Sequence, residues 1–220
     1  MLHAIIFDLD GVICSTDEYH YQAWKKLADL MGIAFDRDVN NRLRGISRRA
    51  SLEILLERYQ GEPLSEAQKE ALAARKNEWY RELLSGMCPK DLSPEVKTTL
   101  DTLRSSGLKL GIGSSSKNTR FILDRIGLTG YFDAISDGEQ ITKSKPDPEV
   151  FLKCAQSLGE APEACLVVED AVSGAEAGHR GGFRVACVGD AASVRAGDFN
   201  LDAFSQLPEI AESLKQTPAG

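Results

Sequence analysis

The chain has 220 residues, enough for one large hydrophobic core or for a core with a smaller inserted unit, and its 42% hydrophobic and 27% charged residues are typical of a soluble globular protein. A formal net charge of −7 gives no long-range attraction to nucleic acid or to an anionic membrane, so we expect neither as a partner. No apolar stretch approaches the ~20 residues that cross a bilayer, and no signal peptide is apparent. Five scattered cysteines indicate free thiols in a reducing compartment, so the expected localisation is cytoplasmic.

The first predicted element is a short strand that ends on acidic residues. The apolar run 4–6 leads into the stretch 7–11, FDLDG, and open α/β sheets bind ligands outside the carboxyl ends of their strands. Asp8 and Asp10 would lie on the same side of a straight strand, since side-chain direction repeats every second residue. Two such carboxylates suit a nucleophile and a proton carrier beside a magnesium ion, although an acidic turn at a strand end has the same appearance.

The next stretch, from about residue 16 to about residue 84, is almost wholly helical in pattern. Apolar residues recur at helical spacing over 19–31, and Gly32 ends that segment. Further helices are predicted over 51–59 and 65–84, and the second of these opens with SEAQ, which resembles a capping box. A helical block inserted after the first strand would sit above the carboxyl edge of the sheet and cover its two acidic residues.

Three later stretches resemble buried parallel strands, because each is short, apolar and closed by polar residues or glycine. They are 108–113, 165–168 and 183–188. Helical patterns, for example over 94–106 and 118–126, separate them. Strands that alternate with helices predict an α/β fold with a doubly wound parallel sheet. The last residues, 216–220, are expected to be frayed.

The later strand ends carry polar groups of different kinds. The stretch 114–118, SSSKN, opens a helix, where hydroxyl and free N–H groups would form an anion site, although an extended helix cap explains the same residues. Lys145 precedes a rigid prolyl turn, which makes a phosphate contact plausible for a residue type that is usually solvated. Glu169 and Asp170 again place two acids at a strand end, where Asp170 could also serve as a helix N-cap.

Taken in order, these strand ends resemble the signatures of the haloacid dehalogenase superfamily of phosphotransferases. The four signatures are the DLDG stretch from Asp8, Ser114, Lys145 in the stretch KPDP, and the pair Glu169-Asp170. Each is weak evidence alone, but four in the family's order at four strand ends are specific. The resemblance implies a Rossmann-like catalytic core over 1–15 and 86–220, with a helical cap domain inserted over 16–85.

The resemblance also implies a role for each of these residues. Asp8 would be the nucleophile that takes the phosphoryl group, and Asp10 would be the general acid and base. Ser114 and Lys145 would hold oxygens of the transferring phosphoryl group. The acid at position 10 argues against a dehalogenase, because a halide leaving group needs no proton. The implied cofactor is Mg²⁺, and its ligands would be Asp8, the main-chain carbonyl of Asp10, Asp170, and Glu169 directly or through water.

Fragments of the helical insert resemble the β-phosphoglucomutase branch of this superfamily. They are TDEYH at 16–20 with AW at 23–24, LRGISR at 43–48, and RKN at 75–77 with Tyr80. This branch interconverts β-D-glucose 1-phosphate and β-D-glucose 6-phosphate through an aspartyl-phosphate enzyme and β-glucose 1,6-bisphosphate. One departure is Arg44, where the pattern has lysine. Arginine keeps the charge but changes the donor geometry, so the sugar preference could differ.

Such a mutase must grip a sugar bisphosphate at both ends, and this requires a second phosphate site. Arg48 with 116–118 would supply it, since a guanidinium makes two parallel hydrogen bonds to phosphate. Each of these residues also has an ordinary structural explanation without a ligand: Trp24 as a core residue, His20 as a structural histidine, and Arg48 with Arg49 as a solvated pair of charges. The substrate-binding residues implied by the resemblance are Thr16, His20, Trp24, Arg44, Gly45, Ile46, Ser47, Arg48, Lys76, Ser116, Lys117 and Asn118.

Two other functions remain open at this point. A sugar-phosphate phosphatase of the same superfamily would share the core chemistry but let water attack the aspartyl phosphate. A non-catalytic sugar-phosphate sensor would keep the fold, but it would not need the pairing of Asp8 with Asp10. The expected partner is a small sugar phosphate, and the chain is expected to be a monomer.

Overall fold

The computed structural model describes residues 1–216 and contains a six-stranded sheet in the order β3-β2-β1-β4-β5-β6. Every neighbouring pair of strands is parallel. This confirms the predicted α/β fold with a doubly wound parallel sheet. The predicted fraying concerned 216–220, of which 217–220 lie outside the described residues. The strands are β1 (Ala4–Phe7), β2 (Lys109–Gly113), β3 (Ala134–Ser136), β4 (Cys165–Glu169), β5 (Arg184–Cys187) and β6 (Phe199–Asn200).

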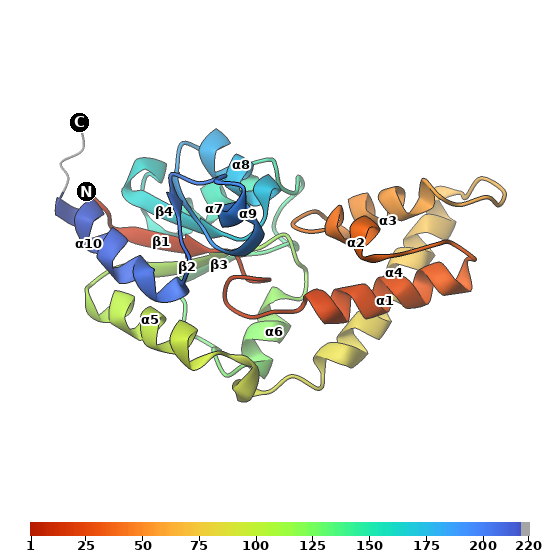
Figure 1. Cartoon of the computed structure of the whole chain (residues 1–220), viewed down its shortest axis with the longest axis horizontal. Helices are drawn as coiled ribbons and strands as arrows, with labels where there is room; N and C mark the ends of the chain where they lie inside the picture. The colour runs from red at the N-terminus through yellow and green to blue at the C-terminus, as the bar shows by residue number, and fades with distance from the viewer. Residues whose placement is uncertain (217–220) are drawn as a thin grey trace.

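Helices cover both faces of this sheet (Figure 1). Strand β1 shows why, because its side chains alternate between two apolar clusters and are all fully buried. Ile5 and Phe7 join the cluster that includes residues of α5 (Pro94–Ser105), α6 (Thr119–Arg125) and α10 (Leu207–Gln216). The opposite face, with Ala4 and Ile6, packs against α7 (Glu149–Leu158), α8 (Val172–Arg180) and α9 (Gly189–Ser193).

Four further helices form a bundle beside the sheet (Figure 1). They are α1 (Asp17–Leu30), α2 (Arg37–Asn41), α3 (Arg48–Leu56) and α4 (Glu66–Leu84). Trp24 and Leu27 on α1 and Ala73 and Tyr80 on α4 are buried members of its apolar core. The predicted capping box at Ser65 is present, with both of its hydrogen bonds formed.

Some elements differ from the sequence-based expectation. Helix α3 was predicted from residue 51, but it begins at Arg48 because the Ser47 hydroxyl oxygen accepts a hydrogen bond from the Ala50 N–H at 3.2 Å. The five-residue α2 and the edge strands β3 and β6 were not predicted, because each is too short to show a periodic pattern. Within residues 1–216, no helix has the length and apolar character that crossing a membrane requires.

Candidate active site

Three buried carboxylates meet where β1 and β4 end. The Asp8 N–H donates to the Val168 carbonyl oxygen at 2.9 Å, so the sheet pairing continues past the end of β1. This places Asp8 beside Glu169, the last residue of β4, with Asp170 directly after it. One oxygen from each of these three residues can lie within 4.8 Å of the others. Three of the four sequence-predicted metal ligands, Asp8, Glu169 and Asp170, are thus brought together by the register of two neighbouring strands, whereas the predicted role of the Asp10 carbonyl stays a prediction.

The donor set of this cluster fits a hard divalent cation. Burial and the neighbouring Glu169 charge raise the pKa of Asp170 to about 7, and burial also raises the pKa of Asp8. Lys145 forms ion pairs with both Asp8 and Glu169, and although burial opposes it, these charges raise the pKa of Lys145. The cluster thus has three carboxyl groups against two cations, Lys145 and the Arg44 guanidinium that pairs with Asp170, and its donor atoms are all oxygen, which is what Mg²⁺ prefers.

Two glycines allow the cluster to close this tightly. Gly11 has φ +87°, and a Cβ atom there would overlap the carboxylate of Asp170. A Cβ atom at Gly174 would overlap the carboxylate of Glu169 in the same way.

The predicted N-cap role of Asp170 is wrong, because the N-cap residue of α8 is Ala171. The Asp170 and Ala171 N–H groups instead donate to Oε2 of Glu169 at 2.9 and 3.0 Å.

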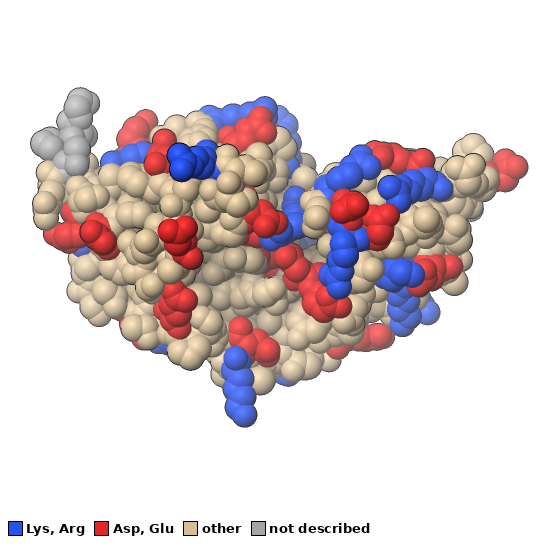
Figure 2. Space-filling view, in the orientation of Figure 1, with Lys and Arg blue, Asp and Glu red and all other residues tan. Residues whose placement is uncertain are grey.

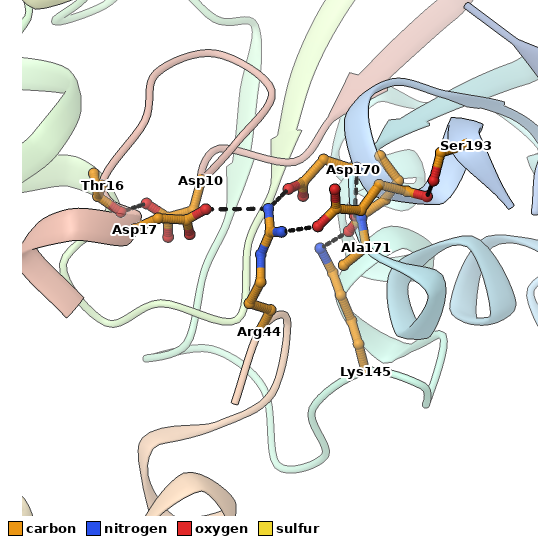
Figure 3. Close-up of polar contacts among 10 residues, drawn as sticks. Asp10, Thr16, Asp17, Arg44, Lys145, Asp170, Ala171 and Ser193 are labelled. Atoms are coloured by element: carbon orange, nitrogen blue, oxygen red, sulfur yellow. Dashed lines mark hydrogen bonds and ion pairs between the residues drawn. The ribbon is translucent and has the colours of Figure 1, made fainter. Parts of the chain in front are cut away.

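Asp10 has a separate environment at the start of the helical bundle. The hydroxyl of Thr16, the fully buried N-cap residue of α1, donates to Oδ1 of Asp10 (Figure 3). Burial raises the pKa of Asp10 to about 6, although the Thr16 hydrogen bond opposes that rise. A carboxyl group with this pKa can both hold and release a proton near neutral pH.

A cavity of about 350 Å³ lies between the sheet edge and the helical bundle. The molecule is hollowed where these two parts meet (Figure 2). Thr16 and Lys145 are buried next to lining residues: Thr16 contacts Asp10, and Lys145 contacts Asp8. The other sequence-predicted site residues line it: Asp8, Asp10, His20, Trp24, Arg44, Gly45, Ile46, Ser47, Arg48, Lys76, Ser114, Ser116, Lys117, Asn118, Glu169 and Asp170.

The bundle wall of the cavity carries a buried polar group built on α1 and α4. Lys76 Nζ lies 2.9 Å from Nδ1 of His20, and the His20 ring stacks on Tyr80 with 4.0 Å between ring centroids. Burial and the Lys76 charge lower the pKa of His20, and burial and the Arg48 charge lower the pKa of Lys76. Lys76 also lies 4.8 Å from the ring centre of Trp24. Trp24 is therefore a core residue and a cavity residue at once.

The two arginines at the start of α3 differ in their surroundings. Both line the cavity, but Arg49 pairs with Glu53 at 3.0 Å and with Glu66. Among residues 1–216, no carboxylate lies within ion-pair distance of the half-buried Arg48, and burial lowers the pKa of its guanidinium. The interpretation of both residues as a solvated pair therefore fails for Arg48. Its positive charge faces the cavity without a partner from the described part of the chain.

The stretch after β2 is folded differently from the predicted helix start. The Ser114 hydroxyl oxygen accepts from the Ser116 N–H at 3.2 Å, and the Ser116 hydroxyl oxygen accepts from the Asn118 N–H at 3.1 Å. These N–H groups are therefore already bonded, and α6 begins only at Thr119. Asn118 donates to Asn77 on α4 at 2.9 Å, which ties this loop to the bundle. Lys117 is exposed and lies 3.8 Å from Glu139.

Sequence reasoning missed several polar residues of the cavity. Asn77 and Tyr80 follow Lys76 on α4 and were noticed only as part of a family pattern, although i+4 spacing places Tyr80 on the same helix face as Lys76. Ser115 was passed over between two predicted ligands, and its hydroxyl is buried without a partner among the described residues. Asp17 was noticed only within the family fragment TDEYH, and no sequence signal marked the polar lining residues Asn40, Ser51 and Glu70.

Comparison with known proteins is consistent with this geometry. The family model of haloacid dehalogenase-like hydrolases matches residues 2–182. A β-phosphoglucomutase of Bacillus subtilis is 41% identical over 94% of this chain and 92% of its own length. A phosphorylated carbohydrates phosphatase of Thermotoga maritima is 31% identical over 83% of this chain and 82% of its own. The crystal structure of a β-phosphoglucomutase from Clostridium difficile, 35% identical, superposes with a TM-score of 0.91 over 98% of both chains.

The family match therefore spans both strand ends that carry the carboxylates and all of the helical insert. The relatives include a mutase and a phosphatase, which act on phosphorylated carbohydrates according to their names. The chain belongs to the haloacid dehalogenase-like hydrolase family.

Proposed function

We propose that this protein is a Mg²⁺-dependent β-phosphoglucomutase, an isomerase that interconverts β-D-glucose 1-phosphate and β-D-glucose 6-phosphate. One observation carries the proposal: Arg48, a guanidinium without a carboxylate partner in the described chain, faces the same cavity as the Asp8–Lys145 pair. A monophosphate hydrolase needs one anion site. A mutase needs two, because its bisphosphate intermediate has a reacting and a non-reacting phosphate.

The first half-reaction would use the sheet edge. An Asp8 carboxylate oxygen attacks phosphorus, and the bond between phosphorus and the sugar oxygen breaks as Asp10 gives its proton to that oxygen. Lys145 and Ser114 would balance the charge on the phosphoryl oxygens. Asp10 is suited to this step because its raised pKa of about 6 leaves a protonated fraction near neutral pH.

The second half-reaction reverses these roles and forms a bisphosphate for the next first half-reaction. The free hydroxyl of a new β-glucose 1-phosphate gives its proton to the Asp10 carboxylate and attacks the phosphorus on Asp8, the bond to Asp8 breaks, and β-glucose 1,6-bisphosphate forms. Before the first half-reaction can follow, this bisphosphate must turn around, so that the phosphate first held by Arg48 reaches Asp8. Ser116, Lys117 and Asn118 would share the binding of the non-reacting phosphate. His20, Lys76 and the stretch 44–47 would contact the sugar.

The proposed cofactor is Mg²⁺, held by Asp8, Asp170, the carbonyl oxygen of Asp10, and Glu169 directly or through water. When bound it would neutralise negative charge on Asp8 and on the phosphoryl oxygens. The proposed domain division is a core of 1–15 and 86–220 with a cap of 16–85, since α1 to α4 pack together beside the sheet. The five free cysteines support a reducing, cytoplasmic location.

A sugar-phosphate phosphatase is the second candidate, because the Thermotoga maritima relative carries that name at 31% identity. The core residues serve both reactions, and the two differ only in whether a sugar hydroxyl or water attacks the aspartyl phosphate. The unpaired Arg48 favours the mutase, since it offers a second phosphate a binding site.

A coupled assay separates the two candidates. The protein is given β-glucose 1-phosphate, Mg²⁺ and a trace of β-glucose 1,6-bisphosphate, and glucose 6-phosphate and free phosphate are followed together. We expect glucose 6-phosphate to form well ahead of phosphate. Release of phosphate without glucose 6-phosphate would make the protein a phosphatase.

A further inference from the structure

Arg44 is a cation of the helical bundle that three carboxylates hold. Its Nη2 lies 3.1 Å from Oδ2 of Asp17 and also pairs with Asp170, while its Nη1 pairs with Asp190. Asp17 is the first residue of α1 and belongs to the bundle, whereas Asp170 and Asp190 belong to the sheet part of the molecule. Figure 3 shows the guanidinium between Asp17 and Asp170. Arg44 therefore bridges the two walls of the cavity.

The backbone fixes Asp190 beside Asp170. The Ala191 N–H donates to the Asp170 carbonyl oxygen at 2.9 Å, so the start of α9 is tied to the residue that follows β4. The Asp190 side chain is 75% exposed and that of Asp170 only 6%. Asp190 is not among the residues that line the cavity. Any effect of Asp190 on a bound sugar phosphate must therefore pass through Arg44.

The contact with Asp190 depends on arginine. A guanidinium has separate terminal nitrogens in a rigid fork, so one can pair with Asp170 and the other with Asp190, whereas a lysine ammonium is a single point charge. The contact with Asp190 therefore uses the second terminal nitrogen of the Arg44 guanidinium.

The loop that Arg44 begins leads directly to the unpaired arginine. Gly45 has φ +73°, and a Cβ atom there would lie 2.6 Å from Oγ of Ser173 on α8, so the loop sits closely on the sheet part. Ser47 caps α3, and Arg48 is the first residue of that helix. A displacement of Arg44 would therefore also move Arg48, because the loop between them is short and packs closely on the sheet part.

We propose that Asp190 is a positioning residue, which holds one arm of Arg44 and so docks the loop 44–48 on the sheet edge. In this position Arg48 is set at a fixed distance from Asp8. The docking itself needs no catalysis, whereas its consequence for substrate binding rests on the proposed mutase function. The two parts can therefore be tested separately.

The first test measures docking without substrate. Hydrogen exchange of the loop 44–48 is compared in wild type, Asp190→Asn, Arg44→Lys and the double variant, with Asp202→Asn as the control that removes one exposed charge elsewhere. An exposed ion pair is worth little, so we expect exchange in Asp190→Asn to be about two- to fivefold faster. The same change should have no effect in the Arg44→Lys background. Equal exchange in Asp190→Asn and wild type, or an undiminished effect of Asp190→Asn in the Arg44→Lys background, would overturn the proposal.

The second test measures turnover of β-glucose 1-phosphate. Asp190→Asn should raise KM by about two- to fivefold with kcat nearly unchanged, and Asp202→Asn should match wild type. At 1 M salt, where the Debye length is about 3 Å, the difference between wild type and Asp190→Asn should disappear. A fall in kcat with unchanged KM would overturn the positioning role. If exchange behaves as expected but no variant forms glucose 6-phosphate, the docking stands and the mutase function fails.

Discussion

The substitution Arg48→Ala tests the second phosphate site directly. Arg48 is the first residue of α3, lines the cavity, and lacks an ion-pair partner among residues 1–216. Its removal therefore breaks no ion pair among these residues, although it takes away a charge that also acts on His20 and Lys76. By contrast, Arg42 pairs with Glu57 at 2.8 Å on the outside of the bundle, and Arg42→Ala is a matched control.

The expected loss follows from the hydrogen bonds that a guanidinium makes to phosphate. Hydrogen bonds to charged groups contribute about 1.5–3 kcal/mol, and part of this is retained because Lys117 lies on the same cavity. A full loss of 1.5–3 kcal/mol corresponds to about a 13- to 160-fold fall in kcat/KM for conversion of β-glucose 1-phosphate, and this is the upper limit of the expected effect. Arg48→Lys should recover part of the loss, because it restores the charge without the fork.

Two assays on the same variants test whether the two proposed phosphate sites are separate. Formation of the aspartyl phosphate from a small donor such as acetyl phosphate reports on the sheet edge alone, and we expect Arg48→Ala to leave it near the wild-type rate. Glucose 6-phosphate formation reports on both sites and should fall as calculated. An equal loss in both assays, or a mutase rate in Arg48→Ala equal to that of Arg42→Ala, would refute the two-site reasoning.

Three further predictions concern the carboxylates of the sheet edge. Asp8→Asn keeps the side-chain volume but removes the nucleophile, so labelling of the protein by a phosphoryl donor and mutase turnover should both fall by about a thousandfold or more; normal turnover would exclude Asp8 as nucleophile. Gly11→Ala would crowd Asp170 and should weaken Mg²⁺ binding measured by calorimetry. Gly32 is also at positive φ, but a Cβ atom there would meet nothing within 4 Å, so Gly32→Ala should cost only about 1–2 kcal/mol of stability. The pKa of Asp10 is raised to about 6 in the folded chain. In metal-free buffer, the unfolding free energy of wild type should therefore fall relative to that of Asp10→Asn as the pH rises from about 4 to about 6. A difference between the two proteins that stays constant across this range would contradict the raised pKa.

The sheet and its strand-end residues could be predicted from the sequence because the controlling interactions are local. The run 4–6 with the acids at 8 and 10 predicts a strand and its polar end, and the parallel register of β1 with β4 then brings Asp8 beside Glu169. The short edge strands β3 and β6 could not be predicted, because pairing with β2 and β5 rather than their own pattern makes them strands.

Side-chain partners could not be predicted in the same way. Nothing in the stretch 43–49, LRGISRR, distinguishes Arg48 from Arg49, and the difference arises because Glu53 and Glu66 lie near Arg49 in space. The contact of Arg44 with Asp190 joins residues 146 positions apart. The helix predicted over 118–126 is present as α6, but the Ser116 and Asn118 N–H groups before it, which were expected to be free, donate to the hydroxyl oxygens of Ser114 and Ser116.

The division of the site between two parts of the molecule bears on which acceptor reaches the aspartyl phosphate. Asp8 and its partners are held by the pairing of β1 with β4, whereas Thr16, the hydrogen-bond partner of Asp10, is the N-cap residue of the first bundle helix. Any movement of the bundle away from the sheet therefore moves the Thr16 hydroxyl and releases the Asp10 carboxylate. Water that enters while the bundle is displaced meets a base that is not held in place. Under the proposed mutase function, a sugar phosphate bound by Arg48 would keep the bundle against the sheet and so meet Asp10 in position, which would favour transfer to sugar over hydrolysis.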